Sequence, residues 1–155
     1  MKVKFKFGIE TYSGTVDSMT YGSYRDDKLC IGREYVYPRI TDNNHAMGNI
    51  MKNLASVYAA ADPLYIADLK TYAMRNGSEN VPKTQLIPTG FSMFIKMMYA
   101  WYDSDPEHVD LASVTVADII ALDADVQTVS DAIDADFLPS VSVYDDLINP
   151  IQSTP

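Results

Sequence analysis

The sequence contains very few residues that could cross-link the chain or bind a transition metal. Cys30 is the only cysteine among 155 residues, and His45 and His108 are the only histidines. One cysteine cannot form an internal disulfide, and one cysteine with two histidines does not provide the Cys/His cluster of a zinc site. We therefore expect packing alone to stabilise the fold, with Cys30 in the core, His45 on the surface, and no cofactor.

Long hydrophobic runs are also absent. No apolar stretch approaches the roughly 20 residues that a membrane-spanning helix needs. Residues 1–7 alternate lysine with bulky apolar residues, whereas a signal peptide has a continuous apolar core. The sequence therefore predicts a protein with no membrane segment and no Sec signal, located in the cytoplasm or in a virion.

Motifs for catalysis are missing as well, because there is neither a Gly-rich phosphate-binding loop nor a paired metal motif. Carboxylates cluster at residues 103–110, but Val114 occupies the twelfth position counted from Asp103, where an EF-hand requires a bidentate carboxylate. We interpret this cluster as an acidic loop at a helix end, although the sequence leaves cation binding open. His108 has no adjacent Cys or Ser partner, and we expect no enzymatic activity.

Basic residues are absent from the last third of the chain. Residues 1–100 contain 12 Lys and Arg against 9 Asp and Glu, a net charge of +3. Residues 101–155 contain no Lys or Arg against 12 acidic residues, a net charge of −12. This gradient indicates either a solvated acidic face or head-to-tail association, in which the two ends of neighbouring copies pair.

The hydrophobic pattern of residues 1–40 predicts strands. Residues 2–7 alternate with period two, which places three lysines on one face and three apolar side chains on the other: Lys2, Lys4 and Lys6 against Val3, Phe5 and Phe7. Residues 15–24 and 29–37 favour extended structure, and Pro38 ends the sheet because proline cannot donate to a ladder. We expect a three-stranded antiparallel β-meander whose first strand lies at an edge.

From residue 41 the period changes to that of helices. Thr41 or Asp42 can cap a first helix, and Asp62-Pro63 has the form of an N-cap followed by a first helical residue. The second helix is expected to run to about Arg75, with Gly77 as a left-handed stop. A third helix after Thr89 is the most apolar segment, and we expect it at the centre of the core.

The acidic third predicts two short helices with matching starts. Thr115 precedes Asp118 by three residues and Thr128 precedes Asp131 by three, a carboxylate variant of the capping box. About five helices are therefore expected, so the fold class is α+β. A chain of this length usually forms one compact domain, which we place at residues 1–148 (meander 1–40, helices 41–148), followed by an extended tail at 149–155.

Residues 13–72 combine the predicted hairpin with the start of the first helix through a set of specific positions: Ser13, Gly14, Val16, Tyr21, Arg33, Val36, Pro38, Thr41 and Asn44. This stretch resembles a loose family of small uncharacterised proteins of bacteriophages and Bacteroidetes-type bacteria, to which no activity is assigned. The resemblance implies a phage or prophage setting. Members of that family tend to be more basic around the hairpin, whereas Asp26, Asp27 and Glu34 balance the basic residues here.

Two functions remain for such a chain. A basic, Tyr-rich meander could bind nucleic acid by phosphate contacts and base stacking, but the net charge of −9 opposes this. Eleven tyrosines and eight methionines instead favour protein interfaces, where both residue types are common. We expect a non-enzymatic structural protein, a phage virion component (capsid, decoration or tail) or a filament subunit, which self-associates as a homo-oligomer or binds other virion or filament proteins. The candidate assembly contacts are Lys2, Lys4, Lys6, Arg25, Arg33, Tyr35, Tyr37, Ile148 and Ile151.

Overall fold

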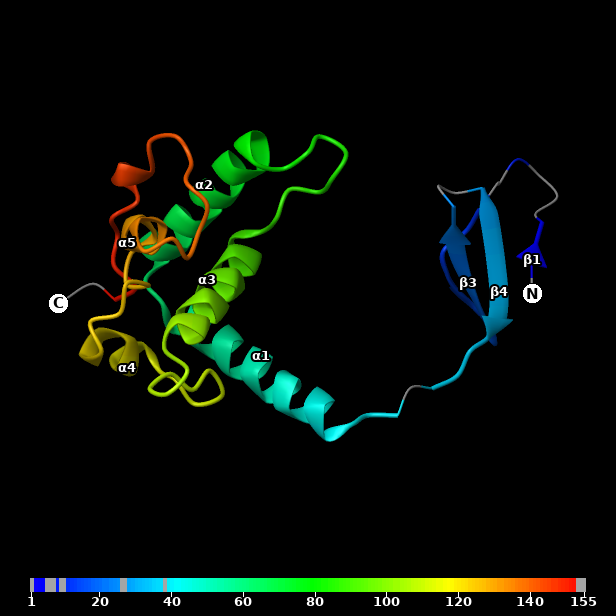
Figure 1. The fold of residues 1–155 in the computed structure, drawn as a ribbon, viewed down its shortest axis with the longest axis horizontal. Helices are drawn as coiled ribbons and strands as arrows, with labels where there is room; N and C mark the ends of the chain where they lie inside the picture. The colour runs from blue at the N-terminus through cyan, green and yellow to red at the C-terminus, as the bar shows by residue number, and fades with distance from the viewer. Residues whose placement is uncertain (1, 5–7, 9–10, 26–27, 38, 153–155) are drawn as a thin grey trace. The chain divides into compact units, whose positions relative to one another are not determined.

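The computed structural model describes residues 2–4, 8, 11–25, 28–37 and 39–152. A small sheet precedes a larger set of helices (Figure 1), so the predicted α+β class is confirmed. The chain divides into two compact units, Met1–Ile40 and Thr41–Pro155, which we call the sheet unit and the helical unit. This division replaces the single domain expected over residues 1–148. Its physical basis is the position of the core, whose buried hydrophobic cluster runs from Leu54 to Ile151.

The described part of the sheet unit contains four antiparallel strands in the order β1-β4-β3-β2: β1 (Lys2–Val3), β2 (Gly14–Val16), β3 (Met19–Tyr24) and β4 (Leu29–Glu34). Read from the C-terminal strand backwards, this is the strand order of a Greek key. The predicted meander is therefore wrong in two respects. The expected strand at 15–24 is a hairpin that turns at Asp17, whose φ is 51°, and β1 pairs with β4 instead of its neighbour in sequence.

The two faces of the sheet carry different side chains. On one face, Cys30 packs beneath Tyr12, whose carbonyl oxygen lies 3.5 Å from the Cys30 sulfur, and Tyr12 contacts Tyr21 edge-on with ring centroids 5.8 Å apart. The other face carries Lys2 and Arg33 together with less polar neighbours, Tyr24, Leu29 and Ile31. We call this second face the basic face. Cys30 is the one hydrophobic side chain of this unit that is fully buried among its described residues.

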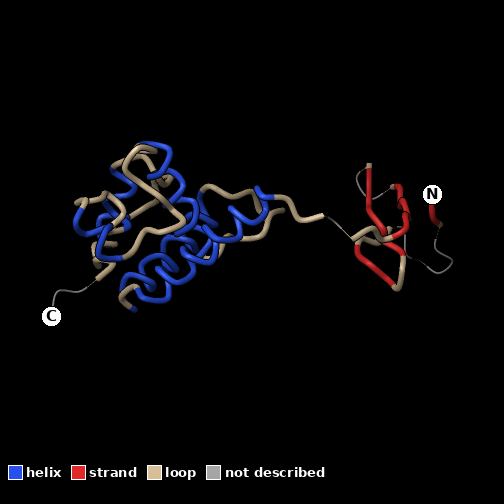
Figure 2. Tube along the Cα trace, turned by 90° about the horizontal axis from the view of Figure 1, so that it is seen from below, coloured by secondary structure: helices blue, strands red, loops and turns tan. Residues whose placement is uncertain are grey.

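The helical unit contains five α-helices and one short 3-10 helix in its described part (Figures 1 and 2): α1 (Asp42–Ala60), α2 (Pro63–Glu79), α3 (Gly90–Ser104), α4 (Val116–Ala121), α5 (Val129–Asp134) and η1 (Tyr144–Asp146). Each α-helix begins at a side chain that accepts a hydrogen bond from a backbone amide of the first turn: Thr41, Asp62, Thr89, Thr115 and Thr128. These caps satisfy amides that the helix itself leaves free, and they confirm the starts predicted from sequence.

The core of the helical unit forms around α3, as predicted. Phe94, Met97 and Met98 are completely buried. Two tyrosines of α2 are also buried, and each donates its hydroxyl to a backbone carbonyl, Tyr65 to Val126 at 2.9 Å and Tyr72 to Pro139 at 2.8 Å. Burial raises the pKa of Tyr65, and it raises that of Tyr72 to about 12. These bonds attach the acidic third of the chain to α2.

The C-terminal segment is not the extended tail that the sequence predicted. Ile151 is fully buried, and its backbone amide and carbonyl bond to Gln127 and Asp62 at 2.8 Å each. Asn149 donates its backbone amide and its side-chain amide to the carboxylate of Asp68, at 3.0 and 2.9 Å. The segment at residues 149–152 is therefore attached to the core, because Ile151 is buried in it and Asp68 pairs with Asn149. Residues 153–155 lie outside the described residues.

Gly77 does not end α2, which continues to Glu79. The reason for glycine at this position is close packing, because a methyl group there would overlap the side chain of Ile87. Ile87 belongs to the segment between α2 and α3. Gly77 therefore lets that segment lie directly against α2.

Candidate assembly surfaces

The predicted contacts of the sheet unit lie on its surface where the structure describes them. Lys2 and Arg33 share the basic face, where the Arg33 guanidinium donates to the Tyr24 hydroxyl at 2.6 Å. Lys4 is exposed just after β1, and Arg25 is exposed at a turn with φ 55°. Lys6 lies outside the described residues. The structure thus places two of the predicted cations on one face.

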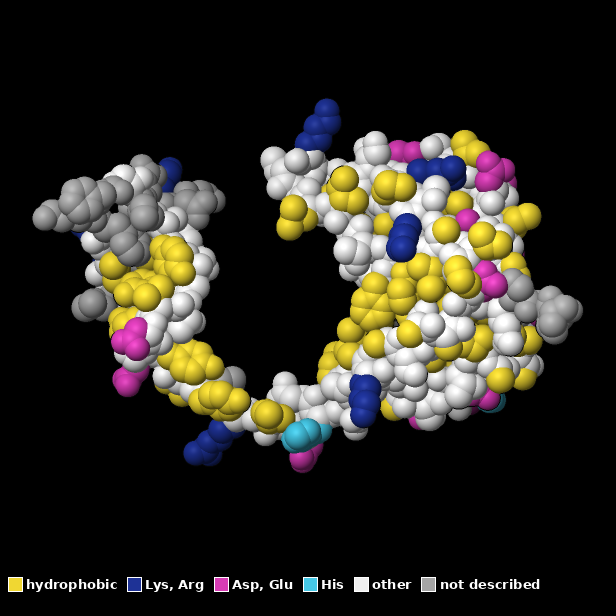
Figure 3. Space-filling view, turned by 180° about the vertical axis from the view of Figure 1, so that it is seen from behind, with side chains coloured by type: hydrophobic (Ala, Val, Ile, Leu, Met, Phe, Trp, Pro, Cys, Tyr) yellow, Lys and Arg dark blue, Asp and Glu magenta, His cyan; other side chains and the backbone are white. Residues whose placement is uncertain are grey.

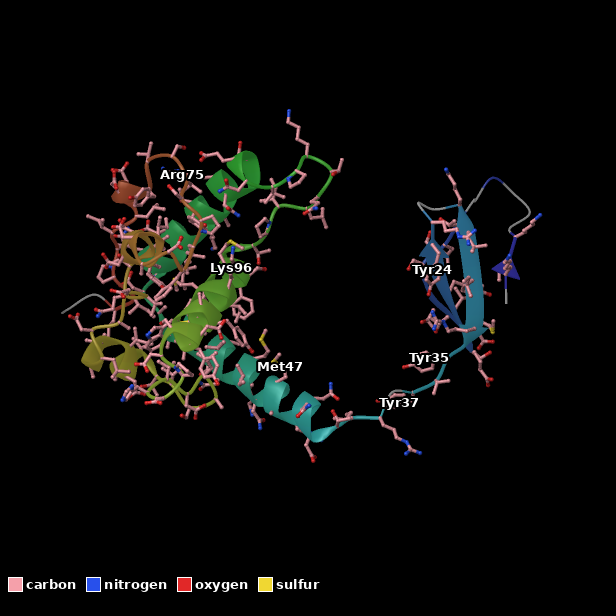
Figure 4. All side chains as sticks on the ribbon, viewed as in Figure 1. Tyr24, Tyr35, Tyr37, Met47, Arg75 and Lys96 are labelled. Carbon is pink, nitrogen blue, oxygen red and sulfur yellow. The ribbon has the colours of Figure 1, made fainter. Side chains whose placement is uncertain are left out.

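Tyr35 and Tyr37 lie beyond the end of β4 and are exposed, as are residues 36, 39 and 40 (Figure 4). Their rings meet edge-on with centroids 6.4 Å apart, and 78% of Tyr37 is accessible to solvent. The backbone amide of Tyr35 donates to Ser18 at 2.7 Å, which attaches Tyr35 to the sheet unit. Two predicted contacts are therefore exposed aromatic side chains.

An apolar surface covers one side of the helical unit along the seam between α1 and α3 (Figure 3). At one end the Tyr99 hydroxyl lies 3.1 Å from the sulfur of Met47, and at the other the Tyr58 ring meets Phe91 at 5.2 Å between centroids. These pairs show that α1 and α3 run antiparallel. We call this surface the seam; its residues are Met47, Met51, Tyr58, Phe91, Ile95 and Tyr99.

The seam ends in an open groove of about 550 Å³ between α2 and α3. Its lining is apolar apart from Lys70 and Thr89: Tyr58, Lys70, Ala73, Met74, Pro88, Thr89, Gly90 and Phe91. Met74 is 63% exposed at its edge. The two helices approach closely here, since a Cβ atom on Gly90 would lie 3.2 Å from the backbone nitrogen of Lys70. The groove can bind an apolar protrusion, with an ammonium group beside it.

A second surface lies at residues 140–148 in the acidic third, where side chains of α2 hold the loop. Arg75 donates to the carbonyl oxygens of Ser142 and Val143, at 3.3 and 2.5 Å, and Glu79 accepts hydrogen bonds from the amide and hydroxyl of Ser142. The pKa of Glu79 is lowered mainly by those bonds from Ser142. Asn80 donates to the Ser140 carbonyl at 3.1 Å. The loop is therefore attached to the last turns of α2.

This loop presents apolar side chains among carboxylates. Val143 has φ 55° and is 60% exposed. A β-branched residue in the left-handed region is strained by about 1–3 kcal/mol and persists only where its surroundings hold it. Ile148 is 65% exposed, as predicted for an assembly contact, and Asp145 and Asp146 lie between the two. Ile151, predicted with Ile148, is buried and cannot serve as a contact.

Several other polar groups of the acidic third form local hydrogen bonds. The His108 ring lies 2.8 Å from Asp105, and Asp110 accepts hydrogen bonds from Ser113 and Ala112, which lower the Asp110 pKa. Asp118 completes the cap of α4. Within the described residues, no three His, Cys, Asp or Glu side chains are grouped so that they could hold a metal ion.

Sequence reasoning missed the seam and the groove. The helical period places Met47, Met51 and Tyr58 in one apolar stripe that faces either a core or a partner. The buried residues of α1 are Leu54 and Val57. The sequence did contain a signal for the seam, namely the width of the apolar stripe of α1. The side chains of Met47, Met51 and Tyr58 lie on one flank of the stripe instead of at its centre. The groove itself depends on residues 88–91, whose position beside α2 no local pattern indicates.

No protein-family model, curated protein or solved structure matches this chain. In the part of the chain that the structure describes, no helix is both long and apolar enough to cross a membrane.

Proposed function

We propose that this chain is a non-enzymatic structural protein that self-associates through the helical unit. The observation that carries the proposal is the apolar surface formed by the seam and the groove. Apolar patches that extend over several side chains mark interaction sites more often than free surface on a monomer. Methionine and aromatic residues, which make up half of this patch, are enriched at such interfaces.

The charge distribution of the helical unit supports the same proposal. Residues 41–100 carry five basic and four acidic residues, whereas residues 101–155 carry twelve acidic residues and no base. Opposite charges on separate surfaces favour encounters in which unlike surfaces of two copies meet. Such heterologous contacts close into rings or continue as filaments, depending on the rotation between copies.

The assembly that we favour is a bacteriophage particle, in which the protein would be a capsid, decoration or tail component. The resemblance of residues 13–72 to small phage-encoded proteins supports this setting. A bacterial filament or surface polymer is the second candidate, since the same contacts would serve it.

Sedimentation velocity of the purified chain at increasing protein concentration tests the proposal, with negative-stain microscopy of the same samples. We expect species larger than a monomer that grow with concentration at low salt and shrink at high salt, because salt screens surface charges. A chain that sediments as a monomer at every concentration and salt would contradict self-association.

Nucleic-acid binding is the alternative, and one observation favours it. Lys2, Arg33 and Tyr24 lie together on the basic face of the sheet, where they could contact phosphates and stack on a base. The net charge of −9 opposes this, so we expect no duplex-DNA complex at about 50 mM salt, where phosphate contacts are strong. A micromolar complex with steep salt dependence, lost in Lys2→Glu/Arg33→Glu, would favour the alternative.

A further inference from the structure

We propose that the groove between α2 and α3 of one copy binds the loop at residues 140–148 of a second copy. This inference rests on the self-association proposed above and specifies the two surfaces that meet. The occupant is a second copy of this chain, and the contact is head-to-tail.

The position of the two surfaces around α2 excludes a contact within one chain. Lys70, Ala73 and Met74 line the groove, whereas Arg75 and Glu79 hold the loop. Successive residues of an α-helix are turned by about 100°, which places the first set and the second set on opposite flanks of α2. The loop is attached to the flank of α2 away from the groove (Figure 4). It can therefore enter only the groove of another copy.

The chemistry of the two surfaces matches. The loop offers two exposed aliphatic side chains, Val143 and Ile148, and the carboxylates of Asp145 and Asp146. The groove offers an apolar lining with the Lys70 ammonium beside it, and its volume lies within the range of natural binding clefts. Lys96, also exposed, follows Ile95 of the seam (Figure 4). Apolar burial with charges of opposite sign at the edge is the usual composition of a specific contact.

The loop is ordered before any contact forms. Arg75 and Asn80 donate hydrogen bonds to this loop and Glu79 accepts them from Ser142, which fixes residues 140–143. The Tyr144 hydroxyl donates to Asp134 at 2.9 Å. Binding of a segment that is already held costs less conformational entropy than binding of a free segment. The same bonds keep Val143 in its left-handed conformation, with its side chain directed outward.

Two charge-reversal variants test the contact. The groove variant is Lys70→Glu/Met74→Glu and the loop variant is Asp145→Lys/Asp146→Lys; all four side chains are exposed, so circular dichroism should show a folded chain. We expect each variant alone to associate about tenfold more weakly or worse in sedimentation. The matched controls place the same charge changes on other exposed residues of the helical unit. They are Lys52→Glu/Leu64→Glu for the groove and Asp103→Lys/Glu107→Lys for the loop. They should associate much as the wild type does.

Mixing the two variants distinguishes a head-to-tail contact from any other. Each variant alone pairs surfaces of like charge. The loop variant keeps an intact groove and the groove variant keeps an intact loop, so an equimolar mixture should regain association. If the wild type associates but the variants associate equally well, the inference fails while self-association stands. If both variants lose association and their mixture stays monomeric, the groove and the loop do not pair. A monomeric wild type would overturn both proposals.

Disulfide trapping provides a second measurement that does not depend on charge. In a Cys30→Ala background, chains with Met74→Cys and chains with Val143→Cys are mixed under mild oxidation. We expect the mixed dimer to form in preference to either homodimer, since only that pair brings the two thiols together. A random mixture, in which the mixed dimer is only twice as abundant as either homodimer, or no dimer at all, would contradict the proposed pairing.

Discussion

Different interactions stabilise the sheet unit and the helical unit of this protein. In the sheet unit, backbone ladders connect four short strands, and Cys30 is the only hydrophobic side chain fully buried among its described residues. In the helical unit, a continuous cluster of buried side chains extends from Leu54 to Ile151. Since burial of apolar area is the main favourable term in folding, the helical unit must account for most of the stability of the chain. The predictions below test this difference.

The largest effect is expected from Phe94→Ala. Phe94 is fully buried in α3, and removal of a buried phenyl ring typically costs about 3–5 kcal/mol. The fluorescence of Trp101, the only tryptophan, reports the unfolding of the helical unit. Urea titration should show a large loss of stability or insoluble protein.

Ile31→Ala in the sheet unit is the control for Phe94→Ala. Ile31 is only half-buried, so its removal should leave the Trp101 transition nearly unchanged. If Phe94→Ala unfolds at the urea concentration of the wild type, the helical core is not where stability resides, and the difference between the units disappears.

A smaller effect is expected from Asp68→Ala. Asp68 accepts two hydrogen bonds from Asn149, and a buried donor left without a partner costs about 1–3 kcal/mol. Removal of the carboxylate should release the C-terminal segment and lower the urea midpoint monitored by Trp101. Asp103→Ala, at an exposed carboxylate of α3, should have no such effect. Faster amide exchange at Ile151 would identify the released segment, and unchanged exchange there would contradict the assigned role.

Thr115→Ala should cost about 1 kcal/mol, the typical effect of losing an N-cap. The Thr115 hydroxyl is paired with Asp118 in a capping box. Hydrogen exchange should show the loss in the amides of α4, whereas the amides of β3 and β4 should exchange as in the wild type. Thr115→Ser, which keeps the hydroxyl, should restore most of the protection. Equal protection in the alanine variant would show that the cap contributes nothing.

The smallest effect concerns pH. Hydrogen bonds from Thr115 lower the pKa of Asp118, and those from Ser142 lower the pKa of Glu79. A carboxyl whose pKa is lower in the folded state contributes stability above its unfolded value of about 4. That contribution is lost as the pH falls through the folded pKa. The free energy of unfolding should decrease on acidification below about pH 4, and less steeply in Asp118→Asn; equal slopes would contradict this.

The sequence predicted those features that depend on neighbouring residues. The five helix starts depend only on local sequence. In each, the capping side chain and the backbone amide that donates to it lie within three residues of each other. The third helix was also correctly placed at the centre of the core, where Phe94 is fully buried. Of the two C-terminal residues predicted as assembly contacts, Ile148 is exposed and stays a prediction, whereas Ile151 is buried and is excluded.

The features that could not be predicted depend on residues far apart in the chain. Asn149 bonds to Asp68 across 81 residues, and Arg75 reaches Val143 across 68. The first pair holds the C-terminal segment against the core, and the second attaches the loop at residues 140–148 to α2. The close fit of Ile87 on Gly77 likewise depends on how the α2–α3 segment folds back. In the sequence, where these contacts cannot be seen, Gly77 suggested a helix end. The apolar segment with prolines at the C-terminus suggested a tail.

Because Cys30 is the only thiol and is buried, the opening of the sheet unit can be measured kinetically on the unmodified protein. Cys30 is 1% exposed beneath Tyr12, so an alkylating reagent can reach it only when that face opens. When closing is faster than alkylation, the labelling rate equals the intrinsic thiol rate multiplied by the equilibrium constant for opening. One reagent and one mass measurement therefore yield the local opening free energy of this sheet, separately from the cooperative unfolding of the helices.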